Sequence, residues 1–253
     1  MKRLEKILFG MLAVLFLLPV AATVIRSFWI EGRFGVQGYQ DLLFDCFVFY
    51  QMFWNSMLYA SVSTLLQLVI ASLCAFGLIQ ARFKGRKILF LAYLVFMMMP
   101  LQVTLLPNYI GLRDLGLLNT RWAILLPSFF SPFGVVVIHQ YMKGIDMEVV
   151  EAMRLESSSV IRIICSAVVP QIKVCMFAVA LFVFADNWNM LEQPVLFLKE
   201  NRLQPLSVLI ANAGEYSGNI LFPAAVLFMI PILLLYLFFK DSLEQGITFG
   251  ERI

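Results

Sequence analysis

Acidic residues along one polar segment are the most informative chemistry in this sequence. The segment runs from Lys143 to about Cys165, where Asp146 is placed to cap a helix and Glu148 suits the positive end of its dipole. One side of the helix should be apolar, formed by Val149, Val150, Met153, Val160 and Ile161. Its polar side carries more Glu than Arg, which disfavours adsorption to anionic lipid and favours docking on a protein partner. We expect serines 157–159 to interrupt the helix.

Polar side chains inside apolar runs form a second group, because such groups are costly in lipid and often functional. The candidates are Gln67, Gln102, Thr104, Asn108, Ser128, Ser131, His139, Asp186, Asn187 and Asn189. A hydroxyl-rich solute needs hydrogen-bond donors, acceptors and aromatic faces. The residues that best suit such a substrate pathway are Gln102, Asn108, Asn187 and Trp188. The alternative for each is polar packing between helices, and we interpret Asp186 and His139 as structural.

No pattern in the sequence indicates catalysis or metal binding. Paired carboxylates, a nucleophile with its base and a metal-ligand cluster are not found, so we predict no catalytic residue, no metal site and no enzyme activity. The cysteines are scattered without a CxxC pair and are interpreted as packing residues: Cys46, Cys74, Cys165 and Cys175. The net charge of +3 is carried by loops without a basic stripe, so no nucleic-acid partner is expected.

The elements that position these groups are predicted to be membrane-spanning helices. Of the 253 residues, 61% are hydrophobic and 14% charged, and a bilayer core asks for about 20 apolar residues per span. Six runs reach that length: Ile7–Ile25, Ser56–Ile79, Ile88–Ile110, Trp122–Tyr141, Ser166–Trp188 and Ile220–Phe239. Continuous rather than alternating runs favour helices over a barrel. The predicted fold class is therefore all-α, with residues 1–253 as a single transmembrane domain.

The distribution of Lys and Arg predicts the orientation, since these residues are retained on the cytoplasmic side. With the N-terminus inside, most of the 19 Lys and Arg residues are cytoplasmic. Both termini and segment 143–165 are then cytoplasmic, and the chain is a multi-pass protein of the cell membrane. The run Ile7–Ile25 also resembles a signal peptide, but it is long enough to be a retained anchor.

Two further features concern the membrane boundaries and the helix geometry. Residues 29–54 combine glycines with aromatic rings that suit the headgroup region, so we expect an interfacial loop or short helix. Prolines recur inside the spans, at Pro19, Pro100, Pro107, Pro127, Pro132, Pro223 and Pro231. They favour helix bends that line a cavity, and the alternative is the general frequency of proline in membrane helices.

Segment 143–165 resembles the EAA loop of binding-protein-dependent ABC importer permeases. The pattern is E-A-A, three residues, Gly, nine residues, I-x-L-P, and it is matched in spacing by Glu151-Ala152-Met153, Ser157 and Pro170. Met153 and Ser157 depart from the consensus Ala and Gly. Flanking stretches such as Leu117–Thr120 and Asn187–Asn189 are similar to the carbohydrate branch, which includes the smaller maltose permease.

The resemblance implies a transport mechanism and a set of partners. In the family this loop is a coupling helix seated in a cleft of the ATP-hydrolysing subunit. The residues that would couple to the ATPase are Glu151, Ala152, Met153, Arg154, Ser157 and Pro170. Because the chain has no Walker A pattern, ATP and Mg are expected on the ATPase, with no cofactor in this chain. The expected partners are an ATPase dimer, a second homologous permease, an extracytoplasmic solute-binding protein and the lipid bilayer.

The alternative function is a subunit of an ion-gradient-driven secondary transporter. Such proteins have internal repeats and buried carboxylates, and the sequence lacks a convincing repeat of its two halves. The resemblance thus favours an ATP-driven importer for a sugar or related polar organic solute in a bacterial or archaeal inner membrane. The particular solute stays open.

Overall fold

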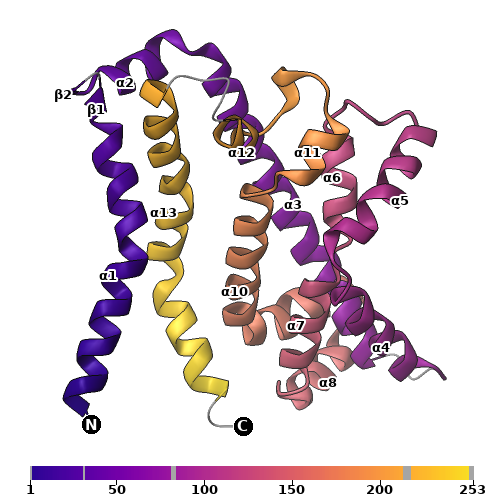
Figure 1. Cartoon of the computed structure of the whole chain (residues 1–253). Helices are drawn as coiled ribbons and strands as arrows, with labels where there is room; N and C mark the ends of the chain where they lie inside the picture. The colour runs from indigo at the N-terminus through magenta and orange to yellow at the C-terminus, as the bar shows by residue number, and fades with distance from the viewer. Residues whose placement is uncertain (1, 31, 81–83, 213–217, 251–253) are drawn as a thin grey trace.

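The first part of the chain is a long helix followed by a short boundary segment and a second long helix. The computed structural model describes residues 2–30, 32–80, 84–212 and 218–250 (Figure 1). Helix α1 (Lys2–Ser27) leads into an antiparallel hairpin of β1 (Trp29–Ile30) and β2 (Arg33–Phe34). Next come α2 (Gln37–Gln40), a π-helical turn (Asp41–Asp45) and α3 (Phe47–Gln80). This hairpin is the only sheet within the described ranges, which agrees with the predicted all-α fold class.

The rest of the chain is a succession of helices. The middle part contains α4 (Arg86–Met97), α5 (Leu101–Asp114), α6 (Trp122–Phe129), α7 (Pro132–Met142), α8 (Met147–Glu156) and α9 (Val160–Ile163). A π-helical turn (Ile164–Val168) then leads into α10 (Val169–Trp188). The last part contains α11 (Glu192–Phe197), a 3-10 turn (Asn201–Leu203), α12 (Leu206–Ala211) and α13 (Gly218–Gly250).

The membrane spans agree in number with the prediction if one bent pair counts as a span. Five helical stretches are long and apolar enough to cross a membrane, at Ile7–Ser27, Phe47–Gln80, Trp122–Met142, Val160–Trp188 and Asn219–Lys240. The sixth is the pair α4–α5, which bends by 100°. The prediction of one continuous helix over Ile88–Ile110 is therefore wrong. Pro100 has an extended backbone at the break, and a proline also disfavours helix in the preceding residue.

Several predicted boundaries also need correction. Helix α3 begins at Phe47 rather than Ser56, so the interfacial segment 29–54 is shorter than expected. The predicted span Trp122–Tyr141 is divided into α6 and α7 at residues 130–131, where Pro132 occupies the first turn of α7. Helix α13 continues beyond Phe239 to Gly250. In each case the helix begins, ends or breaks at a residue that hydropathy does not mark, because hydropathy reports only which residues prefer lipid.

Helices α3 and α10 form the centre of the molecule. Helix α10 packs against α3, α7 and α13, and α3 packs against α7 and α6. Helix α1 lies beside α13 at one edge, away from α4 and α5 (Figure 1). Small residues permit the closest approach: a Cβ on Gly134 of α7 would lie 3.1 Å from the Ala71 Cβ of α3. This packing fixes the walls that surround the candidate site.

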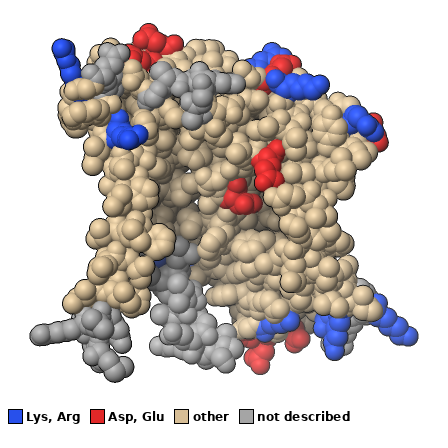
Figure 2. All heavy atoms as spheres, viewed as in Figure 1, with Lys and Arg blue, Asp and Glu red and all other residues tan. Residues whose placement is uncertain are grey.

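The two ends of the molecule are distinct. Helix α8 lies at the same end as the start of α1 and the end of α13, and we call this the α8 end (Figure 1). The loops around α11 and the 3-10 turn lie at the opposite end. Figure 2 shows charged side chains gathered at both ends, with a nearly uncharged band between them. Acidic side chains are visible within that band, on the half of the molecule that holds α5 and α11 (Figures 1 and 2).

Candidate functional site

The start of α8 is joined to α10 by hydrogen bonds. The Asp146 carboxylate accepts a hydrogen bond from the Glu148 backbone N–H at 2.9 Å, which confirms the predicted helix cap. The Gln171 side chain of α10 accepts from the Asp146 N–H at 3.0 Å and donates to the carbonyls of Asp146 and Ala167. Gln171 was not predicted from the sequence, where its signal is its place directly after Pro170. These hydrogen bonds tie the start of α8 to the base of α10.

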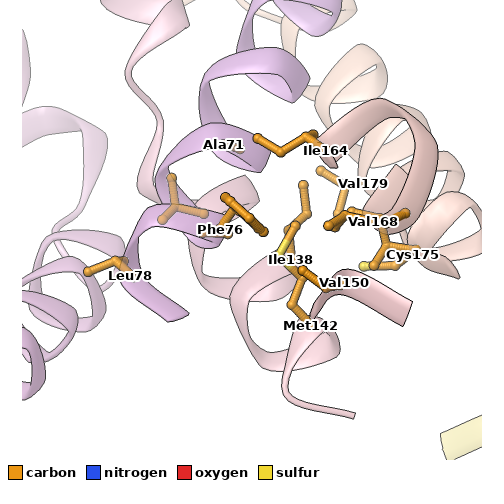
Figure 3. Close-up of a cluster of buried hydrophobic side chains, with 14 of the residues drawn as sticks. Ala71, Phe76, Leu78, Ile138, Met142, Val150, Ile164, Val168, Cys175 and Val179 are labelled. Atoms are coloured by element: carbon orange, nitrogen blue, oxygen red, sulfur yellow. The ribbon is translucent and has the colours of Figure 1, made fainter. Parts of the chain in front are cut away.

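Only part of the predicted apolar side of α8 is buried. Val150 is completely buried, in a cluster that includes Ile138, Met142 and Val168, and Met153 packs against the same cluster (Figure 3). Val149, Val160 and Ile161, which were assigned to the same apolar side, are exposed. The serine interruption turns the chain after Glu156, which moves residues 160–161 off the face of α8. Apolar side chains therefore remain uncovered around the helix.

The residues matched to the EAA pattern divide between exposed and buried positions. Glu151, Ala152 and Arg154 are exposed on α8, whereas Met153 is half-buried. Ser157 ends the helix with an extended backbone at φ −147°, a conformation open to any residue, so glycine is not needed here. Pro170 lies in the first turn of α10, directly after the π-helical turn Ile164–Val168. The pattern thus presents a charged surface on an anchored helix.

A cavity of about 960 Å³ occupies the wall between α5, the α6–α7 break and α10. Its polar lining comes from Gln67, Thr104, Asn108, Ser128, Ser131, Asp186, Asn187, Asn189, Glu192 and Gln193. Aromatic faces are supplied by Phe96, Phe130 and Phe133. The bend at Pro100 and the break before Pro132 both border this space. Helix interruptions at membrane depth are tolerated where they line a cavity, so the position of both is consistent with a cavity in the spanning region.

The four residues predicted for the substrate pathway have different positions. Asn108 and Asn187 line the cavity, and Asn187 also donates to the Val183 carbonyl at 2.8 Å. Gln102 is not part of the lining, but its side-chain amide donates to the Glu192 carboxylate at 3.0 Å. Trp188 is fully buried, stacked against Phe184 and Phe228. Its indole N–H donates to the Phe228 carbonyl at 3.0 Å. Trp188 therefore packs α10 against α13 and does not line the cavity.

The positions of three other polar residues can be compared with what the sequence predicted for them. Asp186, interpreted there as structural, lines the cavity and is exposed to it. Glu192 was not considered at all, because it follows the fifth apolar run and no spacing rule connects it to α5. His139 packs against Phe90, with ring centroids 4.1 Å apart, and does not line the cavity.

At the end of the molecule opposite α8, the side chain of one asparagine joins two loops. Asn119 has a positive φ of 58°, which asparagine tolerates better than most residues. Its side-chain oxygen accepts from the N–H groups of Lys199 and Glu200 at 3.0 Å, and its amide donates to the Glu200 carboxylate at 2.8 Å. Hydrogen bonds from Arg202 and then from Asn119 lower the pKa of Glu200 below its usual value. We call these four residues the Asn119 clip.

Together these features define a multi-pass membrane transport component: a helical bundle with a polar cavity and an exposed helix anchored at one end. Residues 67–249 match the family described as "Binding-protein-dependent transport system inner membrane component", and the chain belongs to that family. Membership confirms the prediction that the chain is a membrane transport component and not an enzyme.

Curated relatives and solved structures support the same assignment. The arabinooligosaccharide transport permease AraQ of Halalkalibacterium halodurans is 28% identical over 206 residues, which cover 80% of this chain and 74% of that protein. The lactose transport permease LacG of Rhizobium radiobacter is 28% identical, over 77% of this chain and 72% of LacG. A chain of a bacterial ABC transporter that imports the acidic polysaccharide alginate shares the fold, with a TM-score of 0.82, 21% identity and 95% coverage of both chains.

Proposed function

We propose that this chain is a permease subunit of an ATP-driven ABC importer for a sugar or related polar organic solute. The family match carries this proposal, since residues 67–249 include both α8 and the cavity. Relatives named for the transport of arabinooligosaccharides and lactose support the sugar class. The solute would pass along the cavity, where Asn108 and Asn187 supply polar contacts and the phenylalanine rings supply apolar faces.

Coupling to ATP hydrolysis would run through α8. Glu151 is exposed and free to pair with a basic group of an ATPase subunit, and Ala152 permits close approach. Leu155, which is 92% exposed, and Val149 would be covered by the partner. Val150 and Gln171 connect that surface to the bundle, so closure of the ATPase dimer would displace the base of α10. ATP and Mg would be bound entirely by the ATPase.

The assembly would contain a second, homologous permease and an extracytoplasmic solute-binding protein. The family description names dependence on a binding protein. An alginate ABC transporter solved with an alginate-bound periplasmic protein supports the same arrangement, with a TM-score of 0.67 to one of its chains. The cavity of this chain would then be completed by the second permease.

The α8 end would face the cytoplasm of a bacterial or archaeal cell, with both ends of the chain on that side. The start of α1, the end of α13 and α8 share one end of the molecule, which fits six crossings (Figure 1). Lys84, Arg86, Lys87 and Lys143 flank the spans there, as expected for the cytoplasmic side.

Uptake by the assembled importer in proteoliposomes tests the proposal. The solute copurified with the binding protein is identified by mass spectrometry, labelled and supplied outside. We expect uptake with internal ATP and none with an imposed proton or sodium gradient. Gradient-driven uptake without ATP would instead support the secondary-transporter alternative and overturn the ABC function.

A further inference from the structure

One mostly buried polar side chain in the cavity wall faces two hollows. Gln67 of α3 is only 3% exposed, yet it lines the cavity and a neighbouring hollow of about 540 Å³. No side-chain hydrogen bond of Gln67 is present within the described residues, so its amide is left open to this space. An amide that faces a space without a protein partner favours a polar occupant there. Ser131 and Asp186 line the same two hollows.

The charge of the cavity is one-sided. Asp186 and Glu192 are the only ionisable residues of its described lining, and both are acidic. Gln102 donates to Glu192, but no Lys or Arg among the described residues forms an ion pair with either carboxylate. Acidic side chains lie within the nearly uncharged band of Figure 2. Because charges interact more strongly away from bulk water, these two carboxylates disfavour an anion in the cavity.

We propose that Gln67, Ser131 and Asp186 form a solute-contacting subsite in this subunit that accepts neutral or amino-bearing sugars and rejects sugar acids and phosphorylated polyols. The amide, hydroxyl and carboxylate supply donors and acceptors for sugar hydroxyl or ammonium groups, and Phe133 offers an apolar face beside them. The subsite rests on the proposed import function. It separates this chain from the alginate importer that shares its fold, whose polysaccharide is acidic.

Thiol modification tests the charge of the subsite without a known solute. The assembled importer, with its four native cysteines replaced, carries Ser131→Cys or, as a control, Gln40→Cys on the exposed boundary segment. Each is treated with cationic trimethylammonium-ethyl or anionic sulfonatoethyl methanethiosulfonate. We expect the cationic-to-anionic rate ratio at Ser131→Cys to exceed that of the control by at least about tenfold. Asp186→Asn with Glu192→Gln should bring it close to the control ratio.

Protection by sugars tests binding itself. Maltotriose, chitobiose and digalacturonate are added at equal concentration before the thiol reagents reach Ser131→Cys. We expect maltotriose and chitobiose to slow modification and digalacturonate to have no effect. Gln67→Leu should weaken protection by at least about threefold, the loss of one to two hydrogen bonds, whereas Gln140→Leu, outside the cavity lining on α7, should not.

The outcomes separate the subsite from the import function. Equal rate ratios at Ser131→Cys and the control, protection by digalacturonate, or no protection by any probe would each overturn the subsite. The uptake assay on the same importer tests import independently. Uptake driven by ATP together with equal rate ratios would overturn the subsite alone.

Discussion

The two ends of the molecule are held together by different interactions. At the α8 end, Val150 is buried in an apolar cluster with residues of α3, α7 and α10 (Figure 3). At the opposite end, α3 holds an irregular segment by polar contacts: Asn55 donates to the Arg202 carbonyl at 2.8 Å, and Tyr59 donates to the Leu203 carbonyl at 2.8 Å. The Asn119 clip holds the start of the same segment, at Lys199 and Glu200.

The difference follows from what each end contains. The loops at residues 198–206 have few repeating backbone hydrogen bonds, so side chains must satisfy their N–H and C=O groups. Helix α8 satisfies most of its own backbone, so Gln171 bonds only to its start and the rest of the helix is held by the apolar anchor. Apolar packing is non-directional and tolerates small shifts, whereas hydrogen bonds lose strength quickly with geometry. The packing of α8 therefore tolerates small shifts of the helix, which the proposed coupling role requires, whereas the hydrogen bonds of the opposite end favour a fixed shape.

The largest expected effect comes from breaking the apolar anchor. Val150→Asp places a carboxylate among Ile138, Met142 and Val168, and should cost more than about 3 kcal/mol because an unpaired buried charge is poorly solvated. Val160→Asp, at a position that is 54% exposed, is the control and should change stability little. Thermal unfolding of the importer in nanodiscs measures both. Equal midpoints for the two variants would refute the anchoring role of Val150.

A surface change on the same helix should alter function without altering stability. Glu151→Lys reverses the charge proposed to meet the ATPase and should reduce solute-stimulated ATP hydrolysis at least about tenfold, the effect of losing a charge pair in an interface. Asp45→Lys, an equal charge reversal at an exposed position away from α8, is the control and should change it by less than about twofold. Retained stimulation in Glu151→Lys, with assembly intact, would contradict the coupling role.

At the opposite end, removal of a single side chain should loosen the loops. Asn119→Gly keeps the positive φ but removes three hydrogen bonds, and should destabilise the protein by about 1–3 kcal/mol. Asn201→Gly in the neighbouring turn is the control, since no side-chain hydrogen bond of Asn201 is present within the described residues. Hydrogen exchange of residues 198–204 should rise in Asn119→Gly alone. Unchanged exchange would show that the clip does not hold the loops.

The smallest expected effect is a pH dependence confined to the polar end. The pKa of Glu200 is lowered by Arg202 and Asn119, so its contribution is present above the ordinary value of 4.5 and is lost as the pH falls through the lowered pKa. Wild type should unfold at a higher temperature than Glu200→Gln at pH 7, and the difference should shrink as the pH falls below 4.5. A difference that does not shrink with falling pH would exclude ionisation of Glu200 as its cause.

The α8 region shows which structural features could be predicted from the local sequence and which could not. Asp146 and the serines predict the two ends of the helix, because caps depend on residues within a few positions of each other. The burial of Val150 alone was not predictable, since Val149 and Ile161 are equally apolar. Which of them is covered depends on where α7 and α10 lie.

The sequence by itself determined the helical membrane fold, the approximate spans and the EAA-type segment, because hydropathy and residue spacing are properties of neighbouring positions in the chain. Only the tertiary structure decided the bend at Pro100, the burial of Trp188 and the meeting of Gln67, Asp186 and Glu192 around one cavity. These residues come from α3, α10 and α11, and their proximity depends on how the helices pack. Packing is set by the shapes of many distant side chains at once, which no local spacing records.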